Sequence, residues 1–153
     1  MGLYQDAIAS ELVYVFQNAE ITHAVVEDQE QVDKVLEIKE QAGRIAHIYY
    51  DDPRGLRHYS QPELTAFEKL RDIGRGHDAA NPGFFDAEVA KGRSSDAASM
   101  FYTSGTTGYP KGVVHTYAAL IDRARVGCEM EGLSDAEEVL AYLPPAWIGQ
   151  NIF

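Results

Sequence analysis

The chain has 153 residues, of which 45% are hydrophobic and 10% aromatic, which indicates a globular rather than a disordered protein with enough length for one real core. Its 24 acidic residues against 13 Lys and Arg give a net charge of −11, which disfavours a nucleic-acid or anionic-membrane partner. Cys128 is the only cysteine, so no internal disulfide can form, and no apolar run reaches membrane-spanning length. We therefore expect a cytoplasmic protein.

The first part of the chain alternates helices with short apolar strands. Asp6 is expected to cap a helix that runs to about Asn18, and Asp28 is expected to cap a second helix. Strands are predicted over 21–26 and 44–50. Because strand–helix–strand units cross over in the right-handed sense, this order predicts an α/β fold with a parallel or mixed sheet flanked by helices.

The middle of the chain is predicted to be helical with linkers. Residues 60–63 (SQPE) have the pattern of a capping box, which would open a helix ending at Gly74 or Gly76. The segments 74–82 and 92–96 have the composition of linkers. We accordingly expect 1–95 and 96–153 to be two portions of one domain.

The second portion is dominated by a polar loop between two β-prone runs. Its hydroxyls and glycines are followed by a proline and one lysine. Glycines without a Cβ let successive backbone amides turn inward as an anion-binding nest, hydroxyls add donors, and the lysine adds one positive charge. We therefore predict a polyphosphate-binding loop made of Thr103, Ser104, Gly105, Thr106, Thr107, Gly108 and Lys111.

This loop is not a Walker A motif, which needs Gly before its Lys, Ser or Thr after it, and a helix beginning there. Here Pro110 precedes Lys111 and Gly112 follows, so a strand leaves the loop. A flexible Ser/Thr/Gly linker is the simpler interpretation of the composition alone, but two bounding strands disfavour it. After the loop, Thr116 is expected to cap a helix that ends near Gly132, and 138–143 is predicted to be a strand.

The run TSGTTGYPKG, entered from FY and left through VVHTY, resembles the phosphate-loop signature of the adenylate-forming enzymes. Within that superfamily, LYQDAIASELVYVFQNAEITHAVVEDQEQVDKVLEI and AYLPPAWIGQNIF resemble long-chain fatty-acid–CoA ligases. The resemblance implies a fatty acid, ATP with Mg²⁺, and coenzyme A as reactants. It also implies that the loop holds the ATP phosphates and that Trp147 borders the acyl pocket, although many relatives carry His there.

The resemblance further implies that the chain is a piece of a longer enzyme and is inactive alone. The family's metal-binding acid, its ribose-binding motif and its C-terminal catalytic lysine have no counterpart in these residues. No catalytic residue or metal ligand is therefore assigned. Two alternatives stay open: an enzyme that adenylates an amino or aryl acid, and a non-catalytic nucleotide-binding or scaffold module.

Other chemistry-bearing residues have structural explanations. His23 and His47 are expected to be ordinary strand residues, and no two histidines have a metal-ligand spacing along the sequence. His115 is closer to the loop, but a structural role is favoured over a ligand contact. Cys128 lies on the apolar face of a predicted helix, so a buried thiol is favoured over a nucleophile.

Overall fold

The computed structural model describes the chain except for residues 104–108, 139, 141–142, 144–145 and 148–153. The chain forms two compact units, Gln5–Ala90 and Lys91–Phe153 together with Met1–Tyr4. Within the described residues, no helix is both long and apolar enough to cross a membrane.

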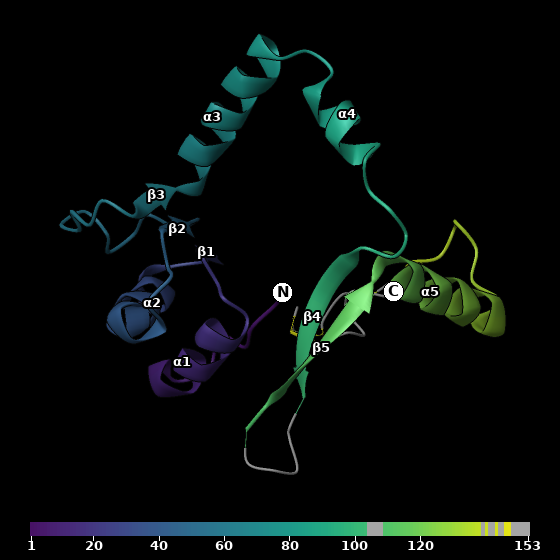
Figure 1. Cartoon of the computed structure of the whole chain (residues 1–153), viewed down its shortest axis with the longest axis horizontal. Helices are drawn as coiled ribbons and strands as arrows, with labels where there is room; N and C mark the ends of the chain where they lie inside the picture. The colour runs from purple at the N-terminus through teal and green to yellow at the C-terminus, as the bar shows by residue number, and fades with distance from the viewer. Residues whose placement is uncertain (104–108, 139, 141–142, 144–145, 148–153) are drawn as a thin grey trace. The chain divides into compact units, whose positions relative to one another are not determined.

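The unit Gln5–Ala90 has a three-stranded parallel sheet with strand order β1-β2-β3, which confirms the predicted α/β class (Figure 1). Its elements in chain order are α1 (Ala9–Asn18), β1 (His23–Val26), α2 (Gln29–Ala42), β2 (His47–Tyr50), β3 (Leu64–Ala66), α3 (Phe67–Ala80) and α4 (Phe84–Val89). The helix α2 connects β1 to β2, and the two strands pair directly from their first residues to their last.

The core of this unit lies between α1, α2 and one face of the sheet. Ala24 and Ile48 are buried on that face, whereas their strand neighbours His23 and His47 are exposed, as the two-residue period of a strand requires. The apolar stripes of the helices cover the buried face and contribute Leu12, Val15, Phe16, Val32, Val35 and Ile38. Each fully buried aliphatic side chain among them stabilises the fold by about 1.5–3 kcal/mol.

Of the caps predicted for the first two helices of this unit, the cap of α2 is confirmed and the cap of α1 is not. Asp28 caps α2, since its Oδ1 accepts from the amide of Gln31 at 3.2 Å. The predicted cap at Asp6 is wrong, because α1 begins later and Ile8 occupies its N-cap position. There the Glu11 carboxylate accepts from the Ile8 amide at 3.4 Å, which satisfies the amide of the N-cap residue itself.

The predicted capping box at 60–63 is also wrong. Glu63 is buried, and its backbone oxygen accepts from the Ile48 amide at 2.9 Å, so the chain pairs with β2 as strand β3. The helix α3 then begins at Phe67 and includes residues 74–80, part of the segment that was predicted to be a linker. Sheet pairing therefore overrides the local helix-start pattern.

The second unit contains an antiparallel pair and one long helix. The strands are β4 (Ala97–Thr103) and β5 (Lys111–Thr116), followed by α5 (Tyr117–Glu131). The Thr116 hydroxyl accepts from the Ala119 amide at 3.2 Å, and Gly132 ends the helix in the left-handed conformation, so both predicted ends are confirmed. The strand predicted over 138–143 lies partly outside the described residues, and its described members are not in a strand.

The described residues of its unit cover the apolar face of α5 only in part. None of the residues of α5 is buried: Ile121 is 65% exposed, and Cys128 is exposed as well. The prediction of a buried thiol at Cys128 is therefore wrong for this chain. The pattern along the helix predicted an apolar stripe correctly, but a stripe becomes buried only where another element packs on it.

Candidate functional site

The two ends of the predicted phosphate loop lie side by side. Thr103 ends β4, Lys111 begins β5, and the two residues are direct partners in the antiparallel ladder. Both are exposed, so their hydroxyl and ammonium groups face solvent at the same end of the two strands. This confirms the predicted strands on both sides of the loop, whereas Ser104, Gly105, Thr106, Thr107 and Gly108 lie outside the described residues.

Gly112, the residue after Lys111, has a packing role that the sequence did not reveal. A Cβ at Gly112 would lie 2.8 Å from the Met100 Sδ and 3.2 Å from the Tyr102 Cζ. These two side chains come from the opposite strand and close over the glycine backbone. The glycine thus allows β4 and β5 to remain tightly packed next to the lysine.

His115 is placed by packing further along the same strands. Its ring meets that of Phe101 edge to face, with the ring centres 5.7 Å apart, and Phe101 is the buried side chain of β4. Such contacts stabilise a pair of strands beyond the area they bury. The contact agrees with the structural role favoured for this histidine.

Trp147, the predicted acyl-pocket residue, is 49% exposed. The residues on both sides of it, 144–145 and 148–153, lie outside the described part of the chain. Its assignment to an acyl pocket therefore stays a prediction.

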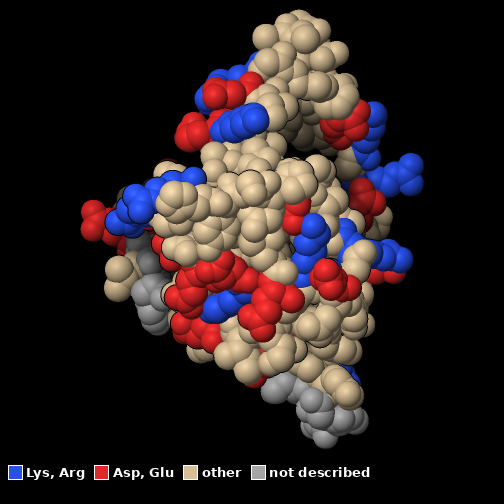
Figure 2. All heavy atoms as spheres, turned by 90° about the vertical axis from the view of Figure 1, so that its left-hand side faces the viewer, with Lys and Arg blue, Asp and Glu red and all other residues tan. Residues whose placement is uncertain are grey.

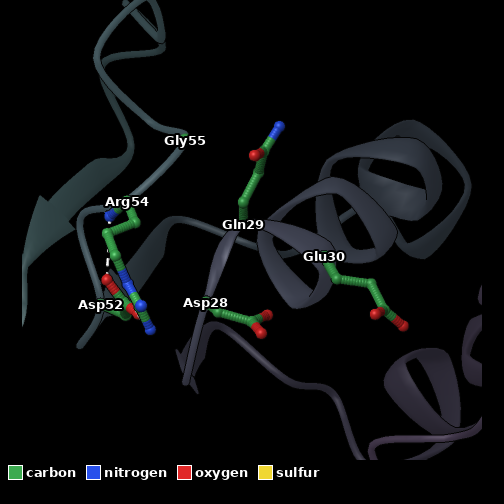
Figure 3. Close-up of a pocket in the computed structure, with 6 residues that line it drawn as sticks. All are labelled: Asp28, Gln29, Glu30, Asp52, Arg54 and Gly55. Carbon is green, nitrogen blue, oxygen red and sulfur yellow. Dashed lines mark hydrogen bonds and ion pairs between the residues drawn. The ribbon is translucent and has the colours of Figure 1, made fainter.

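A pocket of about 320 Å³ lies where β1 and β2 end in the unit Gln5–Ala90. Figure 3 shows the Asp52–Arg54 pair on one side of it and the first residues of α2 on the other. A hydrogen bond from Arg54 to the carboxylate lowers the pKa of Asp52. Asp28 is already engaged as the α2 cap. Asp28 thus acts as a cap residue, as predicted, and Asp52 accepts from Arg54 within its own turn.

Basic side chains do not form a patch of their own on the face drawn in Figure 2, where Lys and Arg stand among Asp and Glu. Many of them are paired at short sequence separations, such as Arg75 with Asp72 at 2.6 Å and Arg125 with Glu129 at 2.7 Å. On this face, acidic and basic side chains are therefore interspersed.

Sequence reasoning missed two contacts between distant residues. Lys39 of α2 forms an ion pair with the buried Glu63. His23 and His47 are direct partners across β1 and β2. A signal for the second contact exists in the sequence, because THAVV and AHIYY place a histidine at the same position of two consecutive strands. In a parallel pair of equal length, such positions meet.

Comparison with known proteins identifies relatives over the whole chain. A family described as AMP-binding enzyme matches residues 1–153. The long-chain-fatty-acid–CoA ligase ACSBG2 of Xenopus laevis is 29% identical over 99% of this chain and 20% of its own length. The long-chain-fatty-acid–CoA ligase FadD15 of Mycobacterium tuberculosis is 30% identical over 88% of this chain and 23% of its own length. The chain thus spans about a fifth of the length of such relatives.

Solved structures share the fold at lower identity. A putative long-chain-fatty-acid CoA ligase from Rhodopseudomonas palustris matches 98% of this chain and 33% of its own, with a TM-score of 0.70 and 15% identity. The anthranilate CoA ligase AuaEII, solved with anthranoyl-AMP, matches 81% of this chain and 21% of its own, with a TM-score of 0.61 and 22% identity. At these identities the likeness concerns the fold.

Proposed function

Because the chain belongs to the AMP-binding enzyme family over residues 1–153, we propose that it is part of an ATP-dependent long-chain fatty-acid–CoA ligase and supplies the ATP phosphate-binding loop. The single observation that carries the proposal is the pairing of Thr103 with Lys111, which brings the two ends of the loop together in a family whose members adenylate acids. The fatty-acid assignment is supported by the names of the curated relatives.

The reaction proposed for the whole enzyme has two steps. A carboxylate oxygen of the fatty acid attacks the α-phosphorus of ATP, and the bond to pyrophosphate breaks, which gives acyl-AMP. The thiol of coenzyme A then attacks the acyl carbon and releases AMP. Mg²⁺ bound with the nucleotide would neutralise phosphate charge, and none of the described residues is assigned to hold it.

This chain's part in the first step is to hold the departing phosphates. The Lys111 ammonium would lie against the β- and γ-phosphates, and the Thr103 hydroxyl would donate to a phosphate oxygen from the neighbouring strand. The loop residues 104–108 would complete the cradle with backbone amides and hydroxyls. Positioning and charge neutralisation suffice for this role, since no covalent bond to the protein forms. Trp147 is proposed to border the acyl chain.

Binding of MgATP and of pyrophosphate, measured by isothermal titration calorimetry, tests the loop. One lysine–phosphate pair at about 4 Å is worth up to ~4 kcal/mol before desolvation. We therefore expect Lys111→Ala to weaken binding of both ligands by about tenfold or more. Lys69→Ala on α3, which removes the same charge from an exposed position of the other unit, is the matched control. Equal effects of the two substitutions would show that net charge, and not the loop, controls binding.

An aryl acid, one of the alternatives that the sequence left open, is the second candidate, and the anthranilate CoA ligase is a protein of this fold that was solved with an aryl-acyl adenylate. The two candidates differ in the acid that they adenylate. Non-hydrolysable analogues of a fatty-acyl adenylate and of an aroyl adenylate, titrated against the same chain, separate them. Tighter binding of the aroyl analogue would favour the second candidate over the first.

A further inference from the structure

The exposed face of the parallel sheet carries two histidines in direct contact. His23 on β1 and His47 on β2 are partners in the ladder, and their ring centres lie 4.9 Å apart with the planes inclined by 36°. Both side chains are exposed, and the ring of Tyr49 lies 6.1 Å from each of them on the same face. Two imidazoles are thus held together by backbone pairing and not by flexible loops.

The separation of the two rings suits a shared metal ion. A zinc–nitrogen bond of about 2.0–2.1 Å places a ring centre about 3.2 Å from the metal. Two such rings would have their centres about 4.5 Å apart at a 90° angle around the metal and about 5.2 Å apart at the tetrahedral angle. The observed 4.9 Å falls between these two geometries. The spacing of the two rings is therefore compatible with chelation by both imidazoles.

One of the two rings is also oriented by a neighbour. The Thr22 hydroxyl lies 2.8 Å from the Nδ1 of His23. In the tautomer in which Nδ1–H donates to this hydroxyl, Nε2 carries the lone pair that binds metals. Metal-binding histidines in proteins commonly hold their second ring nitrogen in this way, which fixes both tautomer and ring orientation.

We propose that His23 and His47 form a two-histidine chelating site for a divalent transition metal ion of the Zn²⁺, Ni²⁺ and Cu²⁺ group. Imidazole is the ligand that these ions share, and water would complete the coordination. The site lies within the unit Gln5–Ala90, does not use the phosphate loop, and is independent of the proposed nucleotide chemistry.

Titration of the 153-residue chain with Ni²⁺ and with Zn²⁺ by calorimetry tests the site. Both ions should bind at one equivalent. Either His23→Gln or His47→Gln should raise the apparent Kd by about tenfold or more, and the double variant should be little worse than either single variant, because one missing ligand already abolishes chelation. His58→Gln and His77→Gln, at exposed histidines on other elements, should leave the apparent Kd unchanged.

A second measurement avoids any dependence on how the variants fold. Imidazole nitrogen resonances of the wild-type chain are followed by NMR as Zn²⁺ is added. The Nε2 signals of His23 and His47 should shift together and reach saturation at one equivalent. Independent shifts of the two histidines, shifts shared equally with His58, or single variants that bind as well as the wild type would each overturn the proposal.

Discussion

The ion pair between Lys39 and Glu63 permits a quantitative test, because one partner is buried and the other is not. The Glu63 side chain is 7% exposed, the Lys39 side chain is 39% exposed, and the pair joins α2 to the start of β3. Exposed pairs contribute about 0.2–1 kcal/mol, whereas breaking a buried pair costs about 3–5 kcal/mol. With one partner in partial contact with water, we expect a coupling free energy of about 1–2 kcal/mol.

A double-mutant cycle measures this coupling. The variants are Lys39→Met, Glu63→Gln and both together, and the readout is hydrogen exchange of the Ile48 amide, which donates to the Glu63 backbone oxygen. The exposed pair Arg71–Glu68 on α3 serves as the control, with an expected coupling of about 0.2–0.5 kcal/mol. Additive effects of the two single substitutions would refute the assignment of Glu63 as a partner that depends on Lys39.

The same pair predicts a pH dependence. The hydrogen bond from Lys39 lowers the pKa of Glu63, so the folded state binds this proton less tightly than the unfolded state. The stabilisation is complete above the unfolded-state pKa of about 4.3 and is lost as the pH falls through the lower folded-state pKa. In Lys39→Met, the fall in unfolding free energy over this acidic range should shrink relative to the wild type.

Two further predictions concern the cap of α2 and the contact between α2 and the loop after β2. Asp28→Ala should destabilise the unit by about 1 kcal/mol through loss of the α2 cap, whereas Asp6→Ala should have no comparable effect, as measured by urea denaturation. Gly55→Ala should cost more than Gly43→Ala. Both glycines have positive φ, but only at Gly55 would the added Cβ meet a neighbour, the Gln29 Oε1 at 1.9 Å. Equal urea midpoints for the two glycine variants would show that the loop around Gly55 accommodates the added Cβ without a loss of unfolding free energy.

The amino-acid sequence by itself determined the features that depend on neighbouring residues. Asp28 and Thr116 cap helices because a side-chain oxygen three residues before an amide is a local arrangement. The strands on both sides of the predicted phosphate loop follow from their own apolar, β-prone residues. The ordered run from Thr103 to Lys111 was sufficient to indicate the family.

Tertiary structure decided the features that depend on residues far apart in the chain. Glu63 has the pattern of a helix start, but it pairs with a lysine from α2, and the chain directly after it joins the free edge of β2 as strand β3. His23 and His47 became neighbours only because a helix brought their two strands into register. Cys128 stayed exposed because, among the described residues, its unit buries no residue of α5. Local sequence patterns are compatible with more than one conformation, and contacts between distant residues determine which one forms.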